Sequence, residues 1–134
     1  MLTYDFCVIG AGWAGFNAAL RARDLGLKAC LIEKSFLGGT CLNTGCIPTK
    51  LLLQSAKLFS SIKKSDLFGI TVSDPGLNLE SLQQKKAKLL NQLRNGMNSQ
   101  LKCIDYLNAE AEIISAEEIK AGPQRIKTKF MLAR

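Results

Sequence analysis

The sequence has no histidine among its 134 residues, and none of its apolar runs is long enough to cross a membrane. A zinc site built from the usual cysteine and histidine ligands would therefore have to rely on cysteine alone. A spanning helix needs about 20 apolar residues, so we expect no membrane segment. The first residues also lack the basic and apolar stretches of a secretory leader, and we expect no signal peptide.

Cysteine is present but does not form the pattern of a disulfide framework. The chain has five cysteines, and an odd number without a secretory leader favours a reducing compartment. We therefore expect a cytoplasmic protein. Hydrophobic residues make up 47% of the chain, as in a soluble globular domain. Cys7 and Cys30 lie in apolar runs and are expected to be buried.

The positive charge is concentrated in the middle of the chain. Residues 57–102 carry eight Lys/Arg against three Asp/Glu, which accounts for +5 of the net charge of +7. A basic helix is typical of proteins that bind nucleic acid or anionic surfaces. A solvated helix face is the more common explanation, and the segment contains no recognisable nucleic-acid-binding module. We expect no nucleic-acid partner, although this segment keeps that alternative open.

The first third of the chain has the pattern of a strand–helix–strand unit. Residues 3–9 form a β-prone apolar run, and residues 10–15 follow with the spacing G-x-G-x-x-G. A helix is predicted over 16–25, and a second strand over 28–32 ends at Glu33. In this context the glycine motif is a strong signal for a dinucleotide-type ligand that contains ADP.

Each residue of that motif has a physical role. Gly10 allows a tight turn, Gly12 lets a pyrophosphate approach the backbone, and Gly15 lets the helix pack closely on the strand. Glu33, at the end of the second strand, can accept hydrogen bonds from ribose hydroxyls. The motif by itself does not distinguish FAD from NAD.

A second motif spans residues 38–50 and contains Cys41 and Cys46. Three interpretations compete for this pair. Zinc would need two further ligands that the chain does not offer. A structural disulfide across so short a loop would add only ~2 kcal/mol and would tend to be reduced in the cell. A redox-active pair fits best, because a helix predicted over 47–59 places Cys46 at its start, where thiolate is favoured.

The rest of the chain is predicted as one long helix and a small sheet. Apolar residues recur at helical spacing over 79–101, and we expect this helix to pack on a sheet rather than form a coiled coil. Residues 110–131 alternate polar and apolar side chains, which predicts an antiparallel meander. The sequence stops directly after an apolar run, and we expect it to be cut off there.

Residues 38–50, following the glycine motif and Glu33, closely resemble the pyridine nucleotide–disulfide oxidoreductases, a group that includes dihydrolipoyl dehydrogenase, glutathione reductase and mercuric reductase. The residues around the two cysteines are most similar to dihydrolipoyl dehydrogenase. The resemblance implies an α/β fold over 1–134: a Rossmann-like FAD-binding domain with a parallel sheet, helices and a small antiparallel β-meander. It implies an N-terminal fragment that lacks the NAD and interface domains.

The resemblance also implies roles for individual residues. Cys41 would exchange with the dithiol substrate, and Cys46 would lie against the isoalloxazine as the charge-transfer thiol. The residues implied to contact FAD are Gly10, Gly12, Gly15, Glu33, Lys34, Gly39, Thr40, Lys50 and Ala111. Among them, Gly39 and Thr40 would line the pyrophosphate, Lys50 would reach the reactive nitrogen of the flavin, and Ala111 would contact the adenine through its backbone.

For the full-length enzyme the resemblance implies a homodimer that passes two electrons from dihydrolipoamide, carried by a 2-oxo acid dehydrogenase complex, through Cys41–Cys46 to FAD and then NAD. The second glycine fingerprint and the histidine base of the family are not in this sequence, so we do not expect turnover from this chain alone. Two alternatives stay open: a non-catalytic FAD- or nucleotide-binding module, and an enzyme similar to glutathione or mercuric reductase.

Overall fold

The computed structural model describes residues 1–133, and it begins with the predicted strand–helix–strand unit. Strand β1 covers Leu2–Ile9, helix α1 covers Trp13–Asp24, and strand β2 covers Ala29–Glu33. Strands β1 and β2 pair in parallel. Helix α1 begins three residues earlier than predicted, because Gly12 in extended conformation already serves as its N-cap.

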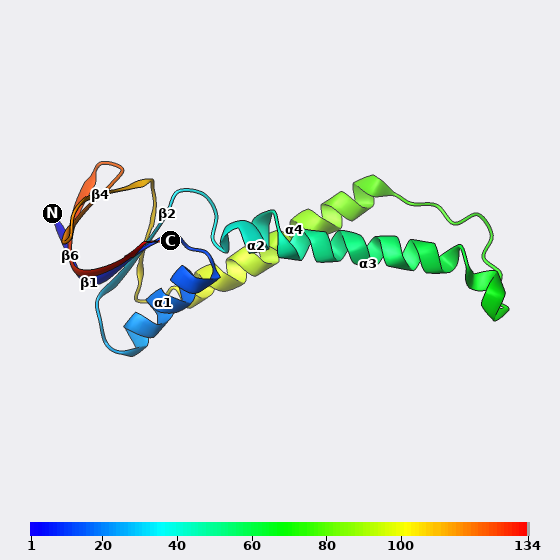
Figure 1. Cartoon of the computed structure of the whole chain (residues 1–134), viewed down its shortest axis with the longest axis horizontal. Coiled ribbons are helices and arrows are strands. Elements are labelled where there is room, and N and C mark those ends of the chain that lie inside the picture. The colour runs from blue at the N-terminus through cyan, green and yellow to red at the C-terminus, as the bar shows by residue number, and fades with distance from the viewer. Residues whose placement is uncertain (134) are drawn as a thin grey trace.

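One six-stranded sheet with the order β3-β2-β1-β6-β5-β4 forms the body of the molecule (Figure 1). Its remaining strands are β3 (Asp105–Asn108), β4 (Ala111–Ser115), β5 (Glu118–Ala121) and β6 (Gln124–Ala133). Strands β3, β2, β1 and β6 are parallel, and β6, β5 and β4 form the predicted antiparallel meander. The predicted α/β fold class, with a parallel sheet and a meander, is confirmed.

Strand β6 is the element that joins the meander to the parallel sheet. It pairs with β5 on one side and with β1 on the other, in register from Leu2↔Ile126 to Ile9↔Ala133. The alternating pattern predicted the strand but not this parallel partner. Strand β3 was not predicted at all, because four residues, two of them exposed and two half-buried, carry too little periodicity to be recognised.

Two hydrophobic clusters make up the core. The first gathers side chains of β1 and β2 with those of α1 and the end of α4, and includes Val8, Leu31, Phe16 and Met97. The second gathers side chains of β1 and β2 with those of the meander: Tyr4, Cys7, Cys30, Ile32, Ile119, Ala121 and Ile126. Cys7 and Cys30 are fully buried, as predicted, and face each other in register. The hydrogen bond to Cys7 and burial raise the pKa of Cys30.

A helical excursion connects β2 to β3. It consists of α2 (Gly39–Asn43), α3 (Cys46–Ile62), the short 3₁₀-helix η1 (Ser65–Phe68) and α4 (Leu79–Gln100). Helices α3 and α4 extend away from the sheet as an arm (Figure 1). The predicted packing of α4 on the sheet core holds only for its C-terminal part, where Leu90 and Met97 are buried. For its N-terminal part it is wrong.

The arm leaves many apolar side chains exposed. The large ones include Leu53, Leu58, Leu67, Phe68, Ile70, Leu77 and Leu79. None of the helices within residues 1–133 combines the length and the apolar character that a membrane span requires.

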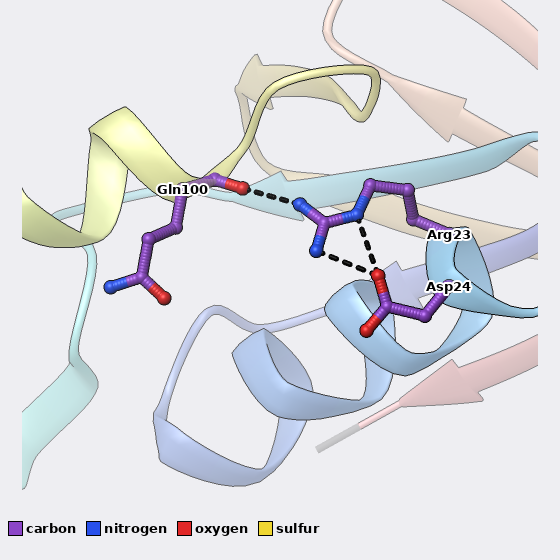
Figure 2. A network of polar contacts seen from close by, with 3 residues as sticks. All are labelled: Arg23, Asp24 and Gln100. Carbon is purple, nitrogen blue, oxygen red and sulfur yellow. Dashed lines mark hydrogen bonds and ion pairs between the residues drawn. The ribbon is translucent and has the colours of Figure 1, made fainter.

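Arg23 fixes the C-terminal end of α4 to α1 (Figure 2). Its Nη1 donates to the carbonyl of Gln100 at 2.7 Å, and its Nε and Nη2 donate to Asp24 Oδ1 at 3.0 and 2.8 Å. The last carbonyls of a helix lack backbone partners, so a guanidinium there both satisfies one acceptor and opposes the helix dipole. The base of the arm is thereby held against the sheet domain.

Tyr4 provides the first testable prediction, because its hydroxyl links β1 to β3 across β2. Tyr4 is 3% exposed and its Oη donates to Asp105 Oδ2 at 2.8 Å. Burial and this hydrogen bond raise the pKa of Tyr4 well above its ordinary value. Tyr4→Phe keeps the packing and removes a hydrogen bond to a charged group, so we expect a loss of roughly 1–2 kcal/mol in the free energy of unfolding, measured by urea denaturation.

Tyr106→Phe is the matched control. The Tyr106 hydroxyl only accepts a 3.3 Å hydrogen bond from Asn108 at an exposed position, so its loss should change stability by less than about 0.5 kcal/mol. Equal effects of the two substitutions would contradict the role of the Tyr4–Asp105 bond.

Candidate functional site

Two glycine turns from separate parts of the chain meet at the carboxyl end of the parallel strands. Gly10 and Gly38 both have left-handed backbones, with φ of 99° and 94°. The N–H of Gly38 donates to the carbonyl of Ala11 at 2.8 Å, and Gly12 and Gly38 form an isolated parallel bridge. A Cβ on Gly39 would lie 3.0 Å from the Cα of Gly12. A side chain at position 39 would push the two turns apart.

Gly15 and Gly12 differ in what surrounds them. A Cβ on Gly15 would lie 2.0 Å from the carbonyl oxygen of Gly10 and 3.1 Å from Val8, so glycine is needed for α1 to pack on the turn. A Cβ on Gly12 would meet no protein atom within 4 Å. The backbone of Gly12 therefore faces open space, as the prediction of a close approach by a pyrophosphate requires.

A cleft of about 690 Å³ runs along these turns from the end of β2 to the dithiol. Seven of the predicted site residues line it: Gly10, Gly12, Gly15, Glu33, Gly39, Thr40 and Cys41. The other lining residues are Trp13, Ala14, Ser35, Phe36, Gly38, Asn43 and Thr44. The cleft therefore gathers both sequence motifs in one place.

Glu33 is held at one end of the cleft by backbone donors. Its Oε2 accepts from the N–H of Ala11 at 2.8 Å, and its Oε1 accepts from the N–H of Ser35 at 2.9 Å. These bonds fix the carboxylate between the glycine turn and the loop after β2. Each oxygen keeps a second lone pair, so the group can still accept hydrogen bonds from two ribose hydroxyls.

Cys41 lies at the other end of the cleft, and Cys46 lies on the adjacent helix. Cys41 belongs to α2, which the sequence did not predict and which the fully buried Leu42 anchors to the core. The chain then turns at Gly45, whose N–H donates to the carbonyl of Thr40 at 2.7 Å, and α3 begins at Cys46. This turn brings Cys41 close enough to Cys46 to influence its pKa.

The environments of the two thiols differ. The hydrogen bond to Cys41 and partial desolvation raise the pKa of Cys46, whereas a backbone hydrogen bond and the charge of Lys50 lower it. Cys41 is half-buried and lines the cleft, whereas Cys46 is exposed. The predicted roles place Cys46 against the flavin and Cys41 toward the substrate. The exposure of the two side chains does not by itself reproduce these roles, and they stay a prediction.

Three predicted cofactor residues lie outside the cleft lining. Lys34 is exposed and pairs with Glu110, with Nζ and Oε1 3.3 Å apart. Lys50 is exposed on α3. Ala111 lines a separate hollow on the meander together with Lys120 and Gly122. Their contacts with a cofactor stay predictions.

Among the side chains of the cleft wall that the sequence did not single out as site residues are Trp13, Phe36 and Asn43. Trp13 opens α1 and is 44% exposed, Phe36 lies in the loop after β2, and Asn43 ends α2. Two of them had a detectable signal, since Asn43 lies between the two cysteines and Trp13 lies within the glycine motif. For metals, residues 1–133 contain no group of three or more histidine, cysteine or acidic side chains placed to bind an ion.

Comparisons with known proteins agree with this geometry. The sequence model of the pyridine nucleotide-disulphide oxidoreductases matches residues 4–132. A dihydrolipoyl dehydrogenase of Acholeplasma laidlawii is 40% identical over 132 residues, which are 96% of this chain and 39% of the relative. One from Bacillus subtilis (strain 168) is 43% identical over 99 residues, or 74% of this chain and 21% of the relative.

A solved structure is similar over nearly the whole chain. The Cu(II) complex of the HOCl-induced flavoprotein disulfide reductase RclA from Escherichia coli superposes with a TM-score of 0.79 at 28% sequence identity, covering 96% of this chain and 27% of that one. The chain thus spans 39% or less of the length of these relatives. The family model covers almost every residue, so the chain belongs to the pyridine nucleotide-disulphide oxidoreductase family.

Proposed function

We propose that the cleft binds FAD and that the chain supplies the flavin- and dithiol-bearing part of a dihydrolipoyl dehydrogenase. The observation that carries this proposal is the continuity of the cleft from Glu33, past the bare backbone of Gly12, to Cys41. An extended dinucleotide placed along it would bring its two ends to an acidic ribose-binding group and to a dithiol. The names of two relatives, both dihydrolipoyl dehydrogenases, support the same assignment.

The start of α1 fits the diphosphate of such a ligand. The first N–H groups of a helix have no partner within the helix and bind anions readily. The N-cap Gly12 makes no side-chain cap, and the first turn of α1 contains no acidic residue. The donors of this turn are therefore available, and no negative charge there repels a phosphate.

FAD bound in the cleft would supply the two-electron acceptor. The two cysteines of the chain would take up the electrons from the substrate before these reach FAD. With Cys41 and Cys46 joined as a disulfide, a thiolate of the substrate would attack one sulfur and release the other cysteine as a thiolate. The second thiolate of the substrate would then attack the substrate sulfur of the mixed disulfide and release the remaining cysteine. The substrate becomes a disulfide, and the pair takes up its two electrons and two protons as two thiols.

The properties of the whole protein follow from the relatives as further proposals. We propose dihydrolipoamide of a 2-oxo acid dehydrogenase complex as the dithiol, NAD as the final acceptor, and a cytoplasmic homodimer. The matched part of the relatives is 39% or less of their length, so the NAD site and the catalytic base would belong to sequence beyond this match. Residues 1–134 would act as a single FAD-binding domain.

FAD binding can be measured directly with Trp13, the single tryptophan of the chain, because it lines the cleft. We expect added FAD to quench its fluorescence. Gly12→Ala places a methyl group in the cleft without touching protein atoms, so it should weaken FAD binding at least about tenfold, or 1.4 kcal/mol, with the midpoint of thermal unfolding unchanged.

Gly96→Ala on α4 is the matched control, since its Cβ also meets nothing within 4 Å and it lies away from the cleft. It should leave FAD binding unchanged. Wild-type chain that neither quenches nor binds FAD would refute the proposed function. Equal binding by Gly12→Ala and wild type would refute the placement of the ligand.

The pKa of Cys46 gives a second prediction, with a sign for each neighbour. Cys41→Ala removes the partner that raises this pKa, so the pH profile of Cys46 alkylation should move to lower pH. Lys50→Gln removes a charge that lowers it, so the profile should move to higher pH. Iodoacetamide labelling of the reduced chain, followed by peptide mass spectrometry, measures both shifts.

Lys57→Gln, farther along α3, serves as the charge control and should leave the profile in place. Shifts opposite to those stated, or an equal shift in Lys57→Gln, would show that these neighbours do not set the ionisation of Cys46.

A further inference from the structure

Arg94 occupies an unexpected position on α4. Leu90 and Met97 on the same face are buried in the core, and Leu93 packs partly buried against it. Arg94 lies between them and is itself half-buried. A guanidinium in an apolar stripe costs desolvation free energy, so its contacts need an explanation.

The partners of Arg94 are all neutral. Its Nη1 donates to Asn43 Oδ1 at 3.1 Å, and its Nη2 donates to Asn91 Oδ1. The guanidinium also lies over the ring of Phe36, 4.7 Å from the centroid. No carboxylate within residues 1–133 forms an ion pair with it. Arg94 is therefore positioned by the loop after β2 and by α2, rather than by a salt bridge.

Asn43 connects Arg94 to the backbone of the cleft. Its Nδ2 donates to the carbonyls of Leu37 at 3.0 Å and Gly39 at 2.8 Å. Arginine can only donate and the two carbonyls can only accept, so the three partners together fix which way the amide points. In this orientation the Asn43 side chain makes all three hydrogen bonds, two as donor and one as acceptor.

We propose that Arg94 is a positioning residue for the cleft and the dithiol. Through Asn43 it holds the turn at Gly38–Gly39, which lies on Gly12, and it holds α2, which carries Cys41. Arg94 lies 51 residues from Asn43 in the sequence. The inference rests on the proposed function where FAD is concerned, but its effect on the dithiol does not depend on FAD.

The first test measures FAD affinity by Trp13 quenching in a double-mutant cycle. Arg94→Met keeps most of the stem and removes the donors, and should weaken FAD binding about fivefold. Lys88→Met removes the same charge from an exposed position of α4 and should have no effect. In an Asn43→Ala background, Arg94→Met should have no further effect. Additive effects, or an equal loss in Lys88→Met, would overturn the proposal.

The second test needs no FAD. In a glutathione buffer, Cys41 and Cys46 form a disulfide as one oxidised glutathione is reduced to two thiols, with two electrons and two protons transferred. If α2 is held less firmly, Cys41 spends less time near Cys46, so the effective concentration of one thiol at the other is lower. Arg94→Met should therefore reduce the equilibrium constant for disulfide formation about threefold relative to wild type and Lys88→Met. An unchanged constant would overturn the proposal.

Arg94→Lys is a second variant, to be used in case Arg94→Met does not fold. It keeps the charge and the stem but replaces the planar fork with a single ammonium group, so it should give a smaller loss of the same sign in both measurements. A wild-type level in both would show that the fork has no positioning role. If wild type binds no FAD, the proposed function fails, while the glutathione equilibrium still decides the role of Arg94.

Discussion

The close approach of two glycine backbones is the constraint on which the rest of the site depends. Gly12 and Gly38 form an isolated parallel bridge. A Cβ added to Gly39 would lie only 3.0 Å from the Cα of Gly12. This contact closes one wall of the cleft and sets where α2 starts. Because α2 carries Cys41 and the turn at Gly45 follows at once, the same contact determines where the dithiol lies relative to the phosphate-binding end of α1.

Around this contact the molecule divides into a sheet domain and a protruding arm (Figure 1). The sheet has a hydrophobic cluster on each face, whereas the distal arm exposes apolar side chains. The two parts are joined through the C-terminal half of α4, by Arg23 at its end and by Arg94 one and a half turns before it. Arg23 donates to the carbonyl of Gln100 on α4, and Arg94 donates to Asn43 on α2. Both acceptors are neutral, so these hydrogen bonds orient α4 without a buried ion pair.

The sequence predicted correctly those elements whose pattern depends on near neighbours. The unit β1-α1-β2 and the meander could both be predicted, because glycine spacing and polar–apolar alternation depend on near neighbours. The redox role of the cysteine pair stays a prediction, and the pKa of Cys46 is raised rather than lowered at the start of α3. Sequence analysis failed for β3, α2 and the position of α4. These elements are short, or their apolar stripe fits more than one partner, so only the assembled core selects the arrangement. Lys34, Lys50 and Ala111 stay predictions as cofactor contacts.

By itself, the sequence determined the family, the fold class and the two motifs, because each depends on residue types at fixed local spacing. The tertiary structure decided that β6 pairs with β1, that Glu33 is fixed by the N–H of Ala11, and that Cys41 rather than Cys46 lines the cleft. It also showed that Arg94 reaches Asn43 across 51 residues. Such contacts join distant segments whose meeting depends on how the whole core packs, and no local spacing encodes them.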